Sequence, residues 1–170
     1  MVKESFCVSS NYQNIQSELE TVLDALRNER NLTLVSSSNS KRVDLIHEAF
    51  SFLREREEAI TYYIDIANTQ TLDELRKIFA EIVVEKDCVS LNQFFHYLSV
   101  LDKRVYIAID NFQQILQYPE KGIDALLRSY VEESTNVTFI FAGNNEHKMH
   151  EMFVSPTKPF YQSTQILRLS

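Results

Sequence analysis

Hydrophobic positions change their spacing along this 170-residue chain, and the spacing predicts helices that alternate with strands. Apolar residues three or four positions apart form one face of an amphipathic helix. Short runs of apolar, β-branched and aromatic residues are typical of strands. The predicted helices are 12–29, 41–57, a segment capped by Thr71, a segment that carries Leu91 to Leu98, 120–133 and 146–153. The predicted strands are 32–35, 59–66, 105–109, 137–142 and 165–169.

Continuous apolar strands alternating with helices indicate a parallel sheet that is covered on both faces. We therefore predict an α/β fold, a three-layer α/β/α sandwich around a five-stranded parallel sheet. Ligands of such sheets bind beyond the carboxyl ends of the strands. Candidate functional residues are consequently those that follow Val35, Ile66, Ile109 and Ala142.

Composition narrows the class of protein. With 44% hydrophobic and 24% charged residues, we expect one globular domain over 1–170, made of a leading helical segment (1–30) and a core (31–170). No apolar run is long enough to span a membrane and no signal peptide is evident, so we expect a cytoplasmic protein without a membrane partner. Cys7 and Cys88 have neither metal-ligand nor disulfide-framework spacing. The net charge of −7 argues against generic nucleic-acid binding.

Glycine is scarce, and this excludes one class of phosphate-binding loop. The chain has two glycines, Gly122 and Gly143, whereas average usage is roughly 7%. Loops such as G-x-x-x-x-G-K-[ST] and G-x-G-x-x-G need several glycines close together. The sequence therefore contains no intact glycine-rich phosphate loop.

The segment after the first predicted strand has the position of a phosphate-binding loop but different residues. It consists of Ser36, Ser37, Ser38, Asn39, Ser40, Lys41 and Arg42. Aligned on the lysine, Val35 and Ser40 take the two glycine positions and Arg42 takes the Ser/Thr position. Asp110 ends an apolar strand one crossover later, where a Walker B aspartate would help to hold Mg²⁺. Asn111 follows it, where a catalytic Glu would stand.

On these residues the sequence resembles the P-loop ATPases of the AAA and STAND type, and among them the archaeal-type ATPases that also abound in gut bacteria. The resemblance covers nearly the whole chain. It is carried by the leading helix and by YIDIANTQTLDEL, RVYIAIDNFQQILQYPE and NVTFIFAGNNEHKMHEMFVSPTKPFYQST. It implies a P-loop NTPase fold with strand order 5-1-4-3-2 and makes Asn144 a sensor-like residue. Relatives usually continue into a winged-helix-like C-terminal domain, which we expect to be absent here.

Departures from the family pattern bear on hydrolysis. Side chains replace both loop glycines, and a residue with a side chain that is forced to positive φ there would be strained. Arg42 places a cation where a hydroxyl would ligate Mg²⁺. Asn111 cannot act as a base, because an amide does not take up a proton near pH 7. We therefore expect degenerate Walker A and Walker B motifs, no catalytic residue, no metal and no ATP hydrolysis.

The leading hypothesis is a degenerate AAA/STAND-like ATPase domain, without a cofactor, that serves as a binding or regulatory module. Its partner would be another protein or the C-terminal region that relatives carry. The alternative is an ATP-binding P-loop ATPase with a glycine-free loop, in which Lys41, Arg42 and Asp110 bind ATP and Mg²⁺. A third hypothesis is an unrelated α/β fold with a different strand order. His147 and His150 lack a third ligand, so we interpret them as surface residues rather than a zinc site.

Overall fold

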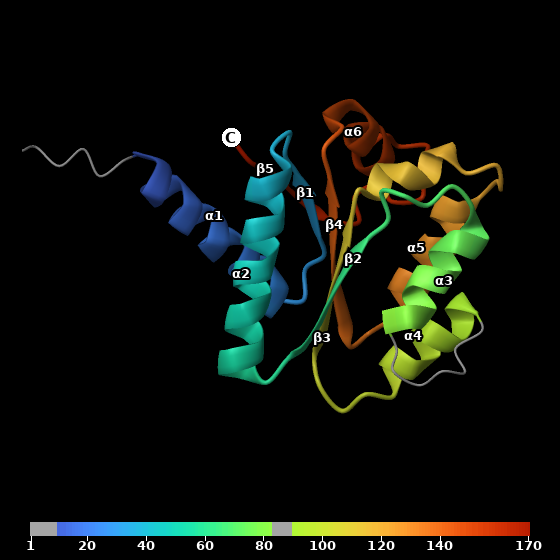
Figure 1. Cartoon of the computed structure of the whole chain (residues 1–170), viewed down its shortest axis with the longest axis horizontal. Helices are drawn as coiled ribbons and strands as arrows, with labels where there is room; N and C mark the ends of the chain where they lie inside the picture. Colours follow the sequence, from blue (N-terminus) through green and yellow to red (C-terminus); the bar gives the residue numbers. More distant parts are fainter. Residues whose placement is uncertain (1–9, 83–89) are drawn as a thin grey trace, which may run out of the picture.

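Five parallel strands form the central sheet of the computed structural model, which describes residues 10–82 and 90–170 (Figure 1). The strands are β1 (Leu32–Val35), β2 (Ile60–Asp65), β3 (Val105–Asp110), β4 (Val137–Gly143) and β5 (Gln165–Arg168). Their spatial order is β2-β3-β4-β1-β5, and each neighbouring pair runs parallel. Counted from the other edge, this is the predicted order 5-1-4-3-2, so the predicted fold class and strand order are confirmed. Cys7 and Cys88 lie outside the described residues.

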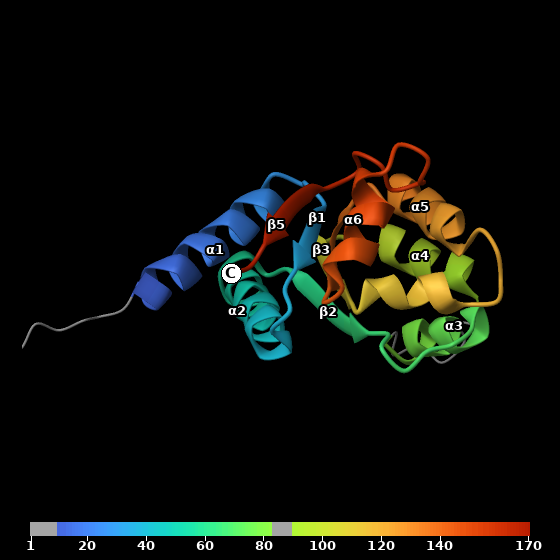
Figure 2. The same cartoon turned by 90° about the horizontal axis from the view of Figure 1, so that it is seen from above.

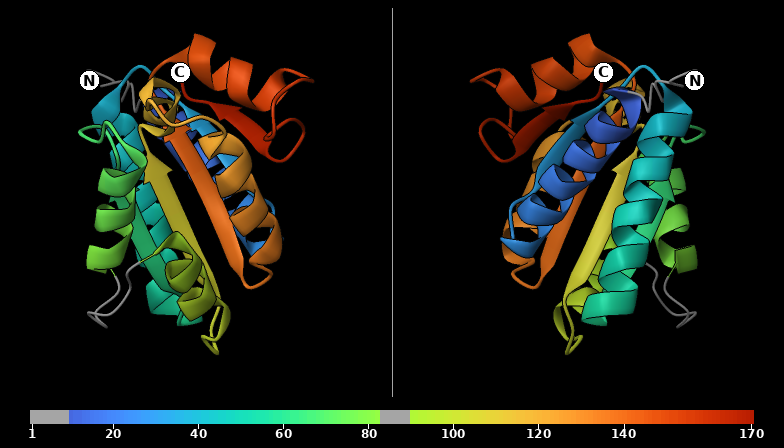
Figure 3. Two further views of the ribbon diagram at one scale, coloured as in Figure 1. Left: turned by 90° about the vertical axis from the view of Figure 1, so that its right-hand side faces the viewer. Right: turned by 90° about the vertical axis from the view of Figure 1, so that its left-hand side faces the viewer.

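Helices cover both faces of the sheet and give the predicted three layers, as Figure 2 and Figure 3 show. Side chains alternate along β3, so that Tyr106 and Ala108 join one core and Ile107 and Ile109 join the other. The first core is covered by α1 (Ser10–Arg27) and α2 (Asn39–Glu57). The second is covered by α3 (Leu72–Ile82), α4 (Leu91–Ser99), the 3₁₀ helix η1 (Phe112–Gln117), α5 (Ile123–Glu133) and α6 (Glu146–Val154). No helix in the described part of the chain is long and apolar enough to cross a membrane.

Aromatic packing fixes the elements around the carboxyl ends of β3 and β4. The ring of Phe141 in β4 lies 4.7 Å from that of Phe112 in η1 and 5.1 Å from that of Phe160. Phe153 of α6 packs against the same ring at 5.5 Å. All four side chains are buried, and such ring pairs contribute about 1 kcal/mol each beyond the area they bury. The packing holds η1 and α6 beside the strand ends at which the candidate site is expected.

Several helix boundaries differ from the prediction by one to three residues, and two of these differences have a clear local reason. α2 begins at Asn39 rather than at 41, because Ser38 is its N-cap and accepts a hydrogen bond from the N–H of Lys41. α5 begins at Ile123 rather than at 120, because Gly122 has a φ of 75° directly before it. The hydrophobic pattern also does not predict η1, which follows β3 almost at once.

Residues other than glycine adopt left-handed backbone in this glycine-poor chain. Over the described ranges, positive φ occurs at Glu29, Glu58, Asn111 and Gln162 as well as at Gly122. For a residue with a Cβ, this conformation costs roughly 1–2 kcal/mol. Glu58 ends α2 with φ 52° and ψ 29°, and its N–H donates to the carbonyl oxygen of Leu53. Helices commonly have glycine at this place.

We predict that Glu58→Gly stabilises the fold. Glycine removes the steric cost of the left-handed conformation, and the net gain in the free energy of unfolding should be about 0.5–1 kcal/mol after the added freedom of the unfolded chain. Urea denaturation measures the change. Glu48→Gly, at an exposed position inside the same helix, is the matched control and should lower the free energy of unfolding by about 1 kcal/mol. A loss of stability in Glu58→Gly would contradict this account of the helix end.

Candidate functional site

A buried carboxylate at the end of β3 is the centre of the candidate site. The side chain of Asp110 is 1% exposed. Its Oδ1 accepts from Nε of Arg42 at 2.7 Å and from the backbone N–H of Asn111 at 2.8 Å. Its Oδ2 accepts from the hydroxyl of Tyr63 at 2.5 Å and from Nη2 of Arg42 at 3.4 Å. Because a carboxylate offers about four lone-pair positions, the chain itself occupies the acceptor capacity of Asp110.

Arg42 joins the candidate segment to this carboxylate. It lies in the first turn of α2, and its side chain is 1% exposed. Besides its bonds to Asp110, it donates from Nη1 to the carbonyl oxygen of Ser36 at 2.9 Å and from Nη2 to Oδ1 of Asn39 at 3.0 Å. These contacts satisfy most of the five N–H groups of a guanidinium. Arg42 is therefore a fixed cation inside the domain, at the position predicted for the Ser/Thr of a phosphate loop.

Tyr63, which the sequence analysis does not single out, completes the network from β2. Burial raises the pKa of the Tyr63 hydroxyl, and the hydrogen bond to Asp110 and the negative charges of Asp110 and Asp65 raise it further. The Arg42 cation opposes this pKa shift but does not cancel it. The phenol therefore remains protonated and donates its hydrogen bond at neutral pH. The available sequence signal is weak: a hydroxyl-bearing side chain three residues before the end of the predicted strand 59–66.

Serine side chains cap the short link between β1 and α2. Since α2 begins at Asn39, only residues 36–38 separate the two elements. The Oγ of Ser36 accepts from the N–H of Ser38 at 3.2 Å, and the Oγ of Ser38 accepts from the N–H of Lys41 at 3.3 Å. Backbone N–H groups that a phosphate loop would offer to its ligand are thus partly occupied by the chain's own hydroxyls.

The two positions aligned with loop glycines lie in regular structure. Val35 is the last residue of β1 and pairs with Gly143 of β4, while Ser40 lies in the first turn of α2. None of residues 35–42, all of them described, has a positive φ. The strain considered for side chains at these positions therefore does not arise, because the segment does not follow a path that needs glycine. Ser37 and Ser40 are exposed.

Lys41 has its partners outside the segment. Its Nζ lies 3.4 Å from a carboxylate oxygen of Glu18 in α1, and it also donates to the carbonyl oxygen of Ser170. The side chains of Lys41 and Glu18 are 24% and 13% exposed. Ser170 reaches this place because pairing with β1 continues past β5, where the N–H of Leu169 donates to the carbonyl oxygen of Val35 at 2.9 Å. Sequence reasoning misses Glu18, which the helical pattern places only beside an apolar face.

Asn111 and Asn144, aligned with the catalytic Glu and the sensor, bond to neighbouring side chains. Asn111 has left-handed backbone (φ 57°, ψ 37°), which Asn tolerates better than most residues. Its Nδ2 donates to Oδ1 of Asp65 at 2.8 Å. The Oδ1 of exposed Asn144 accepts from Nε2 of Gln113 at 2.7 Å. The structure thus groups Asn111 with Asp110 and Asp65, whereas Asn144 pairs with η1.

Gly143 leaves room for neighbouring side chains and does not adopt left-handed backbone. A Cβ at this position would lie 2.3 Å from Oε1 of Gln113 and 2.6 Å from Sδ of Met149. Gln113 is buried, and in the described structure its Oε1 has no hydrogen-bond partner. The absent side chain lets η1 and α6 approach the end of β4.

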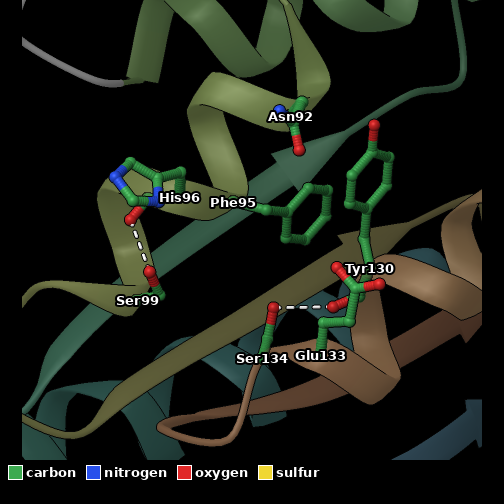
Figure 4. Close-up of a pocket in the computed structure, with 7 residues that line it drawn as sticks. All are labelled: Asn92, Phe95, His96, Ser99, Tyr130, Glu133 and Ser134. Carbon is green, nitrogen blue, oxygen red and sulfur yellow. Dashed lines mark hydrogen bonds between the residues drawn. The ribbon is translucent and has the colours of Figure 1, made fainter.

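A pocket between α4 and α5 lies at the opposite end of the sheet (Figure 4). Its volume is about 130 Å³, and Phe95 stacks on Tyr130 in its wall with ring centroids 4.7 Å apart. Ser99 and Ser134 at its rim donate to the carbonyl oxygens of His96 and Tyr130, so these hydroxyls serve the helix ends. None of the predicted site residues lines this pocket.

Metal-ligating side chains do not gather in the described structure. Over residues 10–82 and 90–170, no three His, Cys, Asp or Glu side chains lie so that they could hold a metal ion. His147 and His150 are exposed on α6. At Asp110 the guanidinium of Arg42 adds a fixed positive charge that would repel a divalent cation.

Solved structures identify the fold. The chain matches the Aeropyrum pernix ORC1 protein in complex with DNA at a TM-score of 0.69, with 14% identity over 91% of this chain and 44% of that one. It matches the A. pernix ORC2 protein, solved as ADPNP–ADP complexes, at 0.65, with 14% identity over 95% and 48%. A Walker-type ATPase of Pyrococcus abyssi matches at 0.60, with 17% identity over 90% and 53%. The chain has the P-loop ATPase fold and resembles the AAA-type ATPase domains of Cdc6/ORC proteins.

This likeness concerns the fold alone, because the identities are low. The chain spans about half the length of these structures. No protein-family model matches the sequence, and no curated protein matches it.

We predict that Arg42→Met lowers the free energy of unfolding by about 3–5 kcal/mol, because it leaves the Asp110 carboxylate buried without a counter-charge. Asp110→Leu should lower the free energy of unfolding by a similar amount, because it leaves the Arg42 guanidinium buried without a counter-charge. The double variant Arg42→Met/Asp110→Leu should recover most of the loss, since it leaves no unpaired buried charge. Urea denaturation of the four proteins completes this double-mutant cycle. Simply additive losses would disprove a coupled pair.

We also predict a pH-dependent contribution of Tyr63. At pH 8 Tyr63→Phe should cost about 1 kcal/mol through loss of the hydrogen bond to Asp110. Above its ordinary pKa of about 10 the hydroxyl loses its proton in the unfolded chain but keeps it in the folded chain. The stability advantage of the parent over Tyr63→Phe should therefore shrink as the pH rises from 10 to 11. Urea denaturation across this range measures it, with Tyr161→Phe as the exposed control; a pH-independent difference would refute the raised pKa.

Proposed function

We propose that this chain is a degenerate ATPase domain of the AAA/STAND type, which does not hydrolyse ATP and acts as a binding or regulatory module. The observation that carries the proposal is the buried ion pair between Arg42 and Asp110. In a P-loop ATPase the loop Ser/Thr and the Walker B aspartate together hold Mg²⁺. Here a guanidinium bonded to the aspartate supplies positive charge from the chain itself.

Two further features support the loss of hydrolysis. Hydrolysis needs a residue that orients or deprotonates the attacking water, and the amide of Asn111 is bonded to Asp65 instead. It also needs backbone N–H groups that cradle the phosphates, whereas residues 36–38 form a short link whose serines cap the backbone. The loop, the metal site and the base are thus altered together.

A domain that does not hydrolyse ATP can still bind a partner. As its partner we propose another protein, or a C-terminal region of the kind that archaeal-type relatives carry, in the cytoplasm. The A. pernix ORC1 protein was solved in complex with DNA, and we do not extend DNA binding from that protein to this chain. The net charge of −7 disfavours generic nucleic-acid binding by this chain.

ATP binding with an unorthodox loop is the second candidate function. One observation favours it: Lys41 lies in the first turn of α2, and its ion pair with Glu18 is long. The A. pernix ORC2 structure contains ADPNP and ADP, so the fold accommodates nucleotides in that protein. Lys41, Arg42 and Asp110 would then bind ATP with or without Mg²⁺.

Calorimetric titration with ATP, in the presence and absence of Mg²⁺, separates the two functions. The proposal expects no binding up to millimolar ATP and no release of phosphate. Lys41→Ala, which removes the ammonium that a triphosphate would require, is the control. Micromolar, Mg²⁺-dependent binding that is lost in Lys41→Ala would overturn the proposal and establish the second function.

A further inference from the structure

The first helix of the described chain holds the lysine of the candidate segment. Glu18 of α1 places its carboxylate 3.4 Å from Nζ of Lys41. The carbonyl oxygen of Ser170 accepts from the same ammonium, and Figure 1 shows the chain end marked C close to α2 and α1. Elements from opposite ends of the described chain therefore meet at this one side chain.

Glu18 is largely desolvated and yet weakly bonded. Its side chain is 13% exposed, and its Oε2 is buried without a hydrogen-bond partner in the described structure. A desolvated carboxylate is costly unless it is well paired, and 3.4 Å is long for a hydrogen bond. The neighbouring Leu19 packs against the core under α1. Burial of the apolar face of α1 therefore keeps the carboxylate at Lys41, rather than the strength of the contact itself.

Charges around the segment are unfavourable to an external anion while Glu18 is in place. The cations Lys41 and Arg42 are paired with Glu18 and Asp110. Asp44 adds an exposed carboxylate in the first turns of α2. Arg42 would keep its partner Asp110 if Glu18 were neutralised, whereas Lys41 would lose the side-chain carboxylate that it pairs with. Glu18 is thus the side-chain carboxylate that competes with an external anion for this ammonium, whose other acceptor is the oxygen of Ser170.

We infer that α1 is an internal inhibitor of anion binding at Lys41, with the carboxylate of Glu18 in the role of the anion. This inference rests on the proposed function, since it assumes that the segment does not hold ATP with Mg²⁺. An external phosphate has to displace Glu18 from Lys41 and loosen α1 from α2. By reciprocity, a partner that draws α1 away raises the affinity of Lys41 for anions by the same factor.

Binding of metal-free inorganic tripolyphosphate to the full chain tests this inference. Glu18→Gln keeps the shape of the side chain, removes its charge and should bind tripolyphosphate about fivefold more tightly than the parent. Glu20→Gln removes the same charge from an exposed position of α1 and should leave the affinity nearly unchanged. Adding Lys41→Ala to Glu18→Gln should abolish the gain.

Hydrogen exchange on the parent chain gives a second measurement that needs no variant to fold. At a tripolyphosphate concentration well above the millimolar range, where the parent becomes occupied, amides of α1 should exchange faster, whereas those of α5 should not change. Without tripolyphosphate, Glu18→Gln should leave the exchange of α1 unchanged, because apolar packing rather than the long contact to Lys41 holds the helix.

Three results would overturn the inference. They are equal affinities of Glu18→Gln and Glu20→Gln, an absence of tripolyphosphate binding by Glu18→Gln, and unchanged exchange of α1 in the parent. Failure of the proposed function has a different signature, which is micromolar binding of ATP with Mg²⁺ by the parent chain. The two outcomes are therefore distinguishable.

Discussion

The ion pair between Arg42 and Asp110 is the constraint on which the candidate site depends. Each buried ion loses several kcal/mol of hydration, and this loss is offset only because hydrogen bonds from the β1–α2 link, β2 and α2 converge on the two side chains. Such a pair contributes little net stability, but losing either partner is costly. It therefore restricts how the β1–α2 link can be built and keeps the carboxyl ends of β2 and β3 together.

Much of the fold follows from the sequence because its strongest signals are local. The apolar run 105–109 predicts β3 to within one residue, and the alternation of such runs with helical spacing predicts a parallel sheet. The order of the strands follows from the resemblance to AAA and STAND ATPases rather than from the pattern itself. Because ligands of such sheets bind at the carboxyl ends of the strands, the sequence predicts that Arg42 and Asp110 lie at the same edge of the sheet. It does not predict that the two side chains bond to each other.

Contacts between elements that are distant in sequence explain what could not be predicted. Tyr63 and Glu18 touch the segment through tertiary packing, and no spacing rule states which way their side chains point. The start of α2 depends on which of several adjacent serines is the N-cap. It is Ser38, whose side chain accepts from the N–H of Lys41. The roles of Lys41, Asn111 and Asn144 remain predictions.

The separation of the partners along the chain also has a consequence for biosynthesis. Arg42 and Asp110 are 68 positions apart, so at about 5–20 residues per second Asp110 is synthesised roughly 3–14 seconds after Arg42. β1 is the first strand of the sheet to be made, yet it pairs only with β4 and β5, the last two. During translation the nascent chain carries a solvated arginine and an unpaired apolar strand until its second half arrives. Early exposure of β1 during synthesis is thus inherent in this strand order.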